Sequence, residues 1–297
     1  MPKSLLTGVL TELVAPFCAD GSLDYNSLQR LIDFQIDRGI RGIYVHGISA
    51  ETLSMTNSEQ TRFVSDAVKA ANGRIPVVAN LMCSNKERAL EQLDAFEDCG
   101  VDCICASQPL MLSAGDEALY DYFAAIFEQS HLPVCLYNMP QSGYVLSPKL
   151  ISRLARQYPI FQGYKDSTQN IIHLQTVAGA VNRDNFSILA GSDATFYSTL
   201  ALGGSGIVSL ISLIFPDLVN GLYQAFCDRN YKEAFSRQIF IMKVRDALKS
   251  APLIAGYKTV VKHLGLFETD FVRSPLLATQ QEQANVLLKK LENLGVL

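Results

Sequence analysis

Short apolar runs alternate with amphipathic helical patterns along most of the chain, and this alternation constrains the fold more than any other feature of the 297 residues. Such alternation is typical of βα units that build a parallel sheet. The runs that fit a buried strand are residues 8–11, 42–47, 75–79, 101–106, 133–137, 161–165, 186–191 and 206–209. Eight successive βα units predict an α/β fold, a (β/α)8 TIM barrel.

Local helix signals separate these predicted strands. Thr56-Asn57-Ser58-Glu59 and Ser84-Asn85-Lys86-Glu87 have the form of capping boxes, and Ser147-Pro148 places a proline in a first helical turn. From about residue 217 the pattern is helical without strands, and helices are expected near residues 231–248, 253–264 and 280–294. We therefore expect a barrel over residues 1–222 and a C-terminal helical extension over residues 223–297.

The composition excludes several classes of function. The net charge is −4 and no basic run occurs, so a nucleic-acid partner is not expected. No stretch approaches the roughly 18 consecutive apolar residues of a membrane span. Met1-Pro2-Lys3-Ser4 lacks the charged-then-apolar pattern of a signal peptide, so the seven cysteines are expected to be reduced thiols of a cytoplasmic protein.

A lysine near the end of the sixth predicted strand is the strongest chemical signal. It is Lys165 in Gly163-Tyr164-Lys165-Asp166-Ser167, and burial of its ammonium without a partner would favour the neutral amine. A neutral lysine adds to a carbonyl carbon and forms a Schiff base. A lysine that reaches solvent from a strand end remains the alternative. Tyr137, at the end of the fifth predicted strand, supplies a phenol that could move protons.

Other polar segments should lie on the same rim, because chemistry in such barrels gathers at the carboxyl ends of the strands. Residues 47–51 follow the second strand and residues 191–193 follow the seventh. Gly203-Gly204-Ser205-Gly206 is expected to join them, since glycines let backbone amides approach a ligand.

Two motifs give the chain a resemblance to the dihydrodipicolinate synthase/N-acetylneuraminate lyase family, and the similarity runs over nearly the whole chain. Tyr137-Asn138-Met139-Pro140 matches the family's Y-N-x-P, and residues 163–167 match its G-x-K-D-S. The resemblance implies a barrel enzyme that forms a Schiff base with pyruvate. It gives Lys165 the Schiff-base role and Tyr137 the role of proton shuttle. It also implies a homotetramer.

The resemblance extends to the substrate-binding residues. Residues 47–51 fall on the G-[ST]-T-G-E loop that holds the pyruvate carboxylate, where Ser49 keeps one hydroxyl and Ile48 replaces the other. Val208 falls on the stretch that flanks the pocket. Asp193 falls where sialic acid lyases contact sugar hydroxyls. Met111, in Pro109-Leu110-Met111-Leu112, stands where the family has a tyrosine contributed by a neighbouring subunit.

These departures shape the expected function. Tyr137 lacks both usual hydroxyl neighbours, and after Pro140 no arginine stands where dihydrodipicolinate synthases bind the carboxylate of their aldehyde. We expect a lyase or aldolase that makes or breaks a C–C bond through a Schiff base with pyruvate or a related 2-oxo acid, with an aldehyde as second substrate. Ile48 and residues 110–112 hint that this aldehyde is apolar or aromatic. The alternatives are dihydrodipicolinate synthase itself and a catalytically impaired protein that binds a 2-oxo acid.

Several other residues have a simpler structural interpretation. Lys258, in a second Gly-Tyr-Lys, is expected at the surface or an interface because its surroundings are helical. Cys99, Cys103 and Cys105 are expected to be buried thiols, since no histidine pattern completes a metal site, and neither a metal nor an organic cofactor is expected. Glu51 should brace its loop and Asp166 should cap the next helix, whereas His46 could touch substrate or form a hydrogen-bonded wall.

Overall fold

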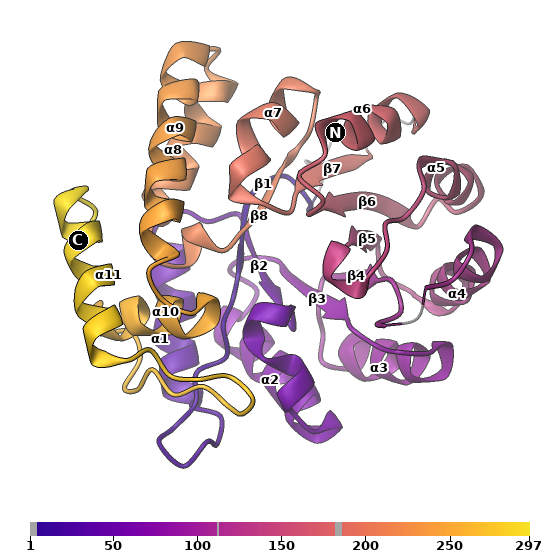
Figure 1. Ribbon diagram of the computed structural model, residues 1–297. Coiled ribbons are helices and arrows are strands. Elements are labelled where there is room, and N and C mark those ends of the chain that lie inside the picture. The colour runs from indigo at the N-terminus through magenta and orange to yellow at the C-terminus, as the bar shows by residue number, and fades with distance from the viewer. Residues whose placement is uncertain (1–4, 112, 182–185) are drawn as a thin grey trace.

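Eight parallel strands close into a barrel in the computed structural model, which describes residues 5–111, 113–181 and 186–297. Each strand pairs with the next along the chain, and β1 pairs with β8 (Figure 1). The strands are β1 (Gly8–Glu12), β2 (Gly42–Val45), β3 (Val77–Leu81), β4 (Cys103–Ser107), β5 (Val134–Asn138), β6 (Phe161–Asp166), β7 (Ser187–Ala190) and β8 (Gly206–Ser209). The predicted (β/α)8 fold is confirmed, with strand bounds shifted by one or two residues.

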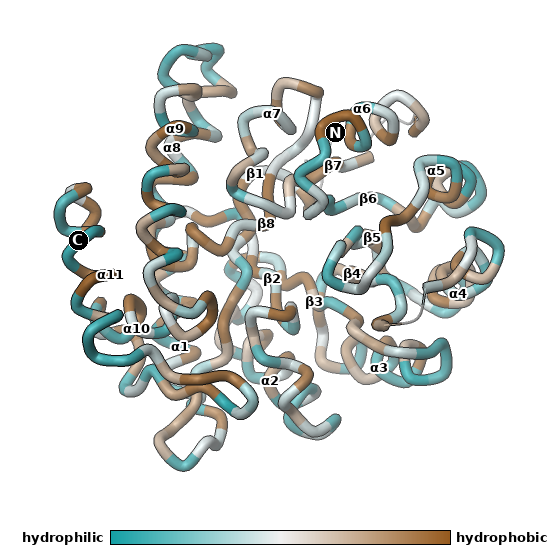
Figure 2. Tube along the Cα trace, viewed as in Figure 1, coloured by the Kyte–Doolittle hydropathy of each residue, from teal (hydrophilic) through white to brown (hydrophobic). Residues whose placement is uncertain are grey.

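Helices surround the barrel and cover its outer face (Figure 1). Those between strands are α1 (Tyr25–Asp37), α2 (Asn57–Ala71), α3 (Lys86–Asp98), α4 (Asp116–Gln129), α5 (Pro148–Gln157), α6 (Ile171–Ala180) and α7 (Phe196–Ala201). After β8 come α8 (Pro216–Cys227), α9 (Tyr231–Leu248), α10 (Leu253–His263) and α11 (Gln281–Asn293). Hydrophilic and hydrophobic segments alternate along these helices, as helices with one buried face require (Figure 2).

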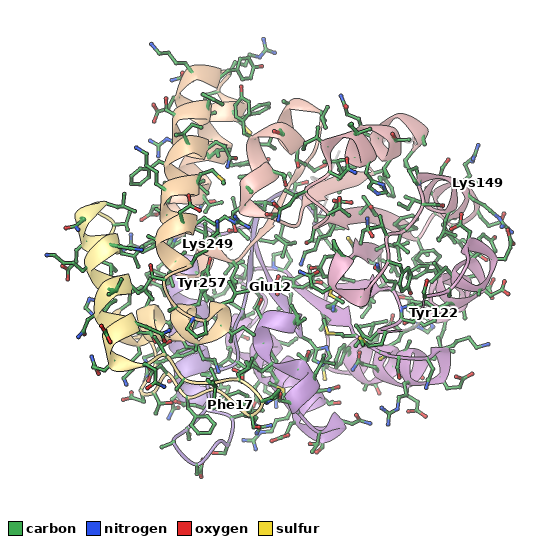
Figure 3. All side chains as sticks on the ribbon, in the orientation of Figure 1. Glu12, Phe17, Tyr122, Lys149, Lys249 and Tyr257 are labelled. Carbon is green, nitrogen blue, oxygen red and sulfur yellow. The ribbon has the colours of Figure 1, made fainter. Side chains whose placement is uncertain are left out.

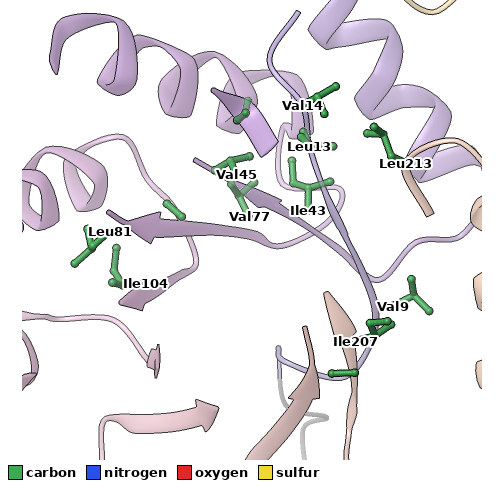
Figure 4. Close-up of a cluster of buried hydrophobic side chains, with 14 of the residues drawn as sticks. Val9, Leu13, Val14, Ile43, Val45, Val77, Leu81, Ile104, Ile207 and Leu213 are labelled. Carbon is green, nitrogen blue, oxygen red and sulfur yellow. The ribbon is translucent and has the colours of Figure 1, made fainter. Parts of the chain in front are cut away.

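Alternate residues of each strand divide the core into two layers. Val9, Ile43, Val45 and Val77 belong to the large cluster between the barrel and its helices (Figure 4). Their neighbours Leu10, Tyr44 and Val78 belong to a smaller cluster inside the barrel. This interior also contains Cys103, Cys105, Cys135, Tyr137, Leu189 and Val208. Since β1 and β6 follow the same alternation, Glu12 and Lys165 project into the interior layer.

Short helical turns follow several strands where the site is expected. The turns η1 (Ile48–Ala50) and η2 (Thr52–Ser54) follow β2, η3 (Pro140–Ser142) follows β5, η4 (Asp193–Thr195) follows β7 and η5 (Ile211–Leu213) follows β8. Thr56 forms the predicted capping box with Glu59. In the second predicted box the N-cap is Asn85 and not Ser84, because the Asn85 side chain accepts the amide of Arg88.

The glycine-rich segment before β8 lies at the opposite end of the barrel from the expected rim, so its inclusion there was wrong. Residues 203–206 precede β8, whereas the site lies where strands end. These glycines serve packing instead: a Cβ on Gly206 would come 2.1 Å from the Gly8 carbonyl oxygen, and one on Gly204 2.6 Å from that of Thr199.

The structure does not describe every residue used in the sequence analysis, and it places the expected domain boundary inside a helix. Residues 1–4, on which the missing signal pattern was judged, and Leu112 lie outside the described residues. The expected boundary at residues 222 and 223 falls within α8. Among the described helices, none combines the length and the apolar character needed to cross a membrane.

Candidate active site

Lys165 is enclosed at the centre of the barrel. It lies on β6, opposite Tyr137 of β5 and Leu189 of β7, and it is fully buried. Its ammonium nitrogen lies 3.9 Å from the centre of the Tyr44 ring and 4.0 Å from that of the Tyr137 ring. Aromatic faces attract a cation, so the two rings fix the position of Nζ from both sides.

Glu12 lies in the candidate site, although its sequence position was not selected as a site residue. It is the last residue of β1, it is buried, and its Oε2 accepts a hydrogen bond from Lys165 Nζ at 3.2 Å. A Cβ on Gly47 would come 2.5 Å from Glu12 Oε1, so the glycine lets the carboxylate lie against the loop after β2. The sequence did contain a signal for Glu12. It is a carboxylate at the carboxyl end of the first predicted strand, and Tyr137 was selected because it ends the fifth.

The pair changes the expected charge state of Lys165. Burial lowers the pKa of Lys165, but the Glu12 carboxylate and other neighbours raise it, and the net pKa lies above the ordinary value. The expected neutral amine depended on burial without a partner, and Glu12 is such a partner. A buried ammonium is stable here because its counter-ion is buried with it. The resting site holds a proton that must leave before Lys165 can act as a nucleophile.

Tyr137 has a hydroxyl neighbour that the sequence analysis did not identify. The Ser167 hydroxyl lies 3.1 Å from the Tyr137 hydroxyl and 2.9 Å from the Gly191 carbonyl oxygen. Because Ser167 carries one hydrogen and a carbonyl only accepts, both contacts are satisfied when Tyr137 donates to Ser167 and Ser167 donates to Gly191. Burial raises the pKa of Tyr137, so its phenol is a proton donor at neutral pH.

A cavity of about 370 Å³ opens above these residues and brings the predicted positions together. Its lining includes Ile48 and Ser49 after β2, Tyr137 of β5, Asp193 after β7 and Val208 of β8. The Asp193 carboxylate already accepts hydrogen bonds from the Ser209 hydroxyl and, at 3.4 Å, from the Ile211 amide. Asp193 is therefore a braced wall of the cavity.

The C-terminal helices supply the remaining wall. Arg245 and Lys249 of α9 and Tyr257 of α10 line the same cavity. Lys249 donates to Asp246 at 2.6 Å, whereas the structure gives Arg245 no hydrogen bond or ion pair among the described residues. Burial weakens the competition from water at a half-buried guanidinium, so Arg245 is available to bind an anionic group.

The apolar segment after β4, residues 109–111 as far as the structure describes it, was expected to line this cavity but does not. Leu110 lines a separate cavity together with Leu53 and Met55. Met111 is 85% exposed, so its side chain faces solvent in this chain. Leu112 lies outside the described residues. Within a single chain, Ile48 is the residue of this predicted apolar set that lines the cavity.

Lys258 is buried and not at the surface, contrary to expectation. It lies on α10 and donates to Glu51 and, at 2.9 Å, to the Phe271 carbonyl. Glu51 also accepts the Arg273 amide at 2.7 Å, and it braces its loop as predicted. The helical pattern around Lys258 was predicted correctly. It could not show that Lys258 pairs with the buried carboxylate of Glu51, which lies on a loop far away in the sequence.

The remaining polar candidates have structural roles. His46 is fully buried, its Nδ1 lies 2.7 Å from the Asn80 carbonyl, and it forms a wall of the barrel. Asp166 does not cap α6, whose N-cap is Asn170; it accepts instead from Thr168, Asn138 and Tyr164. Among the described residues, no cluster of His, Cys, Asp or Glu could hold a metal ion.

A barrel with a buried lysine, a phenol and a cavity at the carboxyl ends of its strands defines the class of Schiff-base lyases. The model of the dihydrodipicolinate synthetase family matches residues 5–294, and the chain belongs to this family. Its enzymes are lyases that use a Schiff base with pyruvate.

Known relatives cover the chain from end to end. The 4-hydroxy-tetrahydrodipicolinate synthase of Maridesulfovibrio salexigens is 30% identical over 98% of this chain and 99% of its own length. That of Sodalis glossinidius is 30% identical over 99% of this chain and 100% of its own. A prophage protein of the dihydrodipicolinic acid synthase family from E. coli K12, solved in complex with pyruvate, has a TM-score of 0.95 and 25% identity over 99% of this chain and 100% of its own.

Proposed function

We propose that this enzyme binds pyruvate or a close 2-oxo acid as an imine on Lys165 and joins it to, or cleaves it from, an aldehyde. The observation that supports this most directly is the position of Lys165 Nζ, which is buried and contacts Glu12 and the Tyr137 ring, two residues that line the cavity together with Ser49. Ser49, beside Ile48, is assigned to the 2-oxo acid carboxylate. Val208 flanks the pocket, and Asp193 is assigned to the second substrate.

Tyr137 is assigned the proton transfers at the substrate oxygen. Its raised pKa keeps the phenol protonated, and its contact with Ser167 orients the hydroxyl. Because Ile48 brings no hydroxyl to the loop after β2, Tyr137 is proposed to exchange protons with the substrate's own carboxylate or hydroxyl.

The experiment that tests the imine is trapping with borohydride and a panel of 2-oxo acids, measured by intact mass. Wild-type protein with pyruvate should gain a stable mass, because reduction converts the imine to a secondary amine on Lys165. Lys165→Ala should gain none. Labelling of Lys258, or of neither lysine, contradicts the proposal.

The second substrate is proposed to be an aldehyde other than aspartate semialdehyde, since Gln141-Ser142-Gly143 follows Pro140 and brings no arginine to the cavity. The second candidate function is 4-hydroxy-tetrahydrodipicolinate synthase, which the names of the relatives favour. Arg245 could then replace the missing cation. Turnover of pyruvate with aspartate semialdehyde at a rate within the range of about 1–10³ s⁻¹ decides for this candidate.

Three further proposals concern the whole protein. We propose that it is cytoplasmic, that it assembles as a homotetramer, and that residues 223–297 form an extension to a barrel of residues 1–222. Exposed Met111 and Leu53 support the assembly, because apolar side chains near one rim would otherwise face water.

A further inference from the structure

The proton on Lys165 needs an acceptor inside a closed site. Glu12 Oε2 is 3.2 Å from Nζ, and the two side chains are 11% and 1% exposed, so bulk water has little access to the contact. The rings of Tyr44 and Tyr137 cover the nitrogen from two sides. A carboxylate at this distance, in this enclosure, is placed for direct proton transfer.

We propose that Glu12 is a catalytic acid/base that takes the proton from the Lys165 ammonium and returns it to the oxygen that leaves as the imine forms. The proposal rests on the imine chemistry of Lys165 described above and assigns its proton steps. It concerns a residue whose position on β1 places it against the reacting nitrogen itself (Figure 3 labels Glu12 in the middle of the molecule).

The steps balance in atoms and charge. Glu12 accepts one proton, and the free amine of Lys165 forms a C–N bond as the carbonyl π bond breaks. A second proton moves from nitrogen to the new oxygen, with the Tyr137 phenol as carrier, and gives a neutral carbinolamine. Protonated Glu12 then donates to the carbinolamine hydroxyl, the C–O bond breaks, and water leaves. The products are an iminium and the Glu12 carboxylate, which now pairs with the iminium charge.

The alternative is that Glu12 is only a static counter-ion. The two roles make opposite predictions, because a counter-ion that holds Lys165 protonated would slow attack on the ketone. Removing it would then leave a buried amine with a lower pKa and speed imine formation. A proton-transfer role predicts slower imine formation, since neither removal of the proton nor loss of water would have a partner.

The test is the rate of imine formation, measured by mixing enzyme with pyruvate, quenching with borohydride at set times and recording intact mass. Glu12→Gln should form the imine about 10²–10⁴-fold more slowly than wild type, the range of general acid–base catalysis. Glu12→Asp, which keeps a carboxylate on a shorter side chain, should lie between them. Glu97→Gln removes a carboxylate of similar burial on α3 that contacts Ser130 and His131, and it should match wild type.

The pH profile separates transfer within the pair from simple loss of a charge. If Glu12 takes the proton, the wild-type rate should be nearly constant from about pH 6 to 9, because the proton only moves between the two partners. In Glu12→Gln the rate should rise about tenfold per pH unit until the amine is neutral. The other titratable groups around Glu12 are Tyr44, Cys105, Tyr137 and Tyr257, in addition to Lys165. Cys105→Ala should keep the flat profile.

The outcomes are distinct. If wild type traps no 2-oxo acid, the proposed function fails and not merely the role of Glu12. If wild type traps pyruvate and Glu12→Gln traps it as fast or faster, the static counter-ion explains the pair and the proposal is overturned. If Glu12→Gln does not fold, as judged by circular dichroism, the wild-type profile decides: a tenfold rise per pH unit overturns the proposal and a flat profile supports it.

Discussion

The Ser167 hydroxyl lies 3.1 Å from the Tyr137 hydroxyl and joins it to the Gly191 carbonyl. Residue 167 is two positions beyond Lys165, so both side chains point to the interior from the same strand end. The segment that carries Lys165 therefore also supplies the hydroxyl that contacts the phenol.

Replacing Ser167 with alanine should slow turnover by about fivefold, because one hydrogen bond of about 1 kcal/mol is lost from the phenol. Tyr137→Phe should cost about 10²–10⁴-fold. Ser167→Thr, which keeps a hydroxyl, should stay near wild type. In the Tyr137→Phe background Ser167→Ala should have no further effect on kcat, since the two groups act in one path. Additive losses in the double variant would show that they act separately.

The Glu51–Lys258 pair should be essential to stability. Both side chains are fully buried, so Glu51→Gln leaves an ammonium without its charge partner and should lower the free energy of unfolding by about 3–5 kcal/mol. The double variant Glu51→Gln/Lys258→Met removes both charges and should recover most of this loss. Urea denaturation measures both. A loss below about 1 kcal/mol in Glu51→Gln would contradict the role of the pair.

His46 should make the protein sensitive to acid. Burial lowers the pKa of His46 from 6.5 to about 4. Between these two pH values the His46 imidazole is protonated in the unfolded chain and neutral in the folded chain. Stability should therefore fall as the pH decreases from 6.5 to about 4, by roughly 3 kcal/mol at 1.36 kcal/mol per pKa unit. His46→Asn suits the positive φ of 61° and should flatten that part of the profile. Thermal melting at each pH tests this, and an unchanged slope in the variant would count against it.

Arg245 should select substrates with a negative charge. Glyoxylate and glycolaldehyde are small aldehydes that differ in carrying a carboxylate or a hydroxyl. Arg245→Gln should raise KM for glyoxylate condensation with pyruvate by about ten- to a hundredfold, the value of a hydrogen bond to a charged group, and leave glycolaldehyde unaffected. Lys243→Gln, an exposed residue on the same helix, is the control. Equal effects on both aldehydes would mean that Arg245 supports only the fold.

The assembly should depend on the patch formed by Leu53, Leu110 and Met111. Sedimentation of wild type at micromolar concentration should show a tetramer, and Met111→Asp should shift it toward smaller species, because a charge cannot be buried there without a partner. Circular dichroism of the variant checks that the barrel stays folded. A stable wild-type monomer would refute the proposed tetramer.

The sequence predicted the barrel because its signal is periodic and local. Each strand and helix carries its own apolar pattern, so eight units could be counted before their neighbours were known. It also predicted one rim for these side chains, because the ends of parallel strands meet there: Tyr137 and Ser49 line one cavity, and Lys165 Nζ lies against the Tyr137 ring.

What the sequence could not show depends on pairs that are far apart along the chain. Glu12 and Lys165 are separated by 153 residues, and Glu51 and Lys258 by 207. A lone lysine gives no sign of where its counter-ion lies, so one was expected to be neutral and the other exposed. The glycines before β8 were assigned to the wrong end of the barrel for a different reason. Their composition resembles that of a ligand-binding loop, but they precede the strand and so lie at the end opposite the site.

The contacts made by α9 and α10 have a consequence for how this family could diversify. The two helices supply Arg245 and Tyr257 to the cavity and Lys258 to the loop that carries Glu51. A chimera that exchanged the segment from α9 onward between two relatives would thus import a new cavity wall together with the counter-ion of the loop that carries Glu51. Recombination at this point would alter selectivity in a single event, while Glu12, Tyr137 and Lys165 stayed on inherited strands.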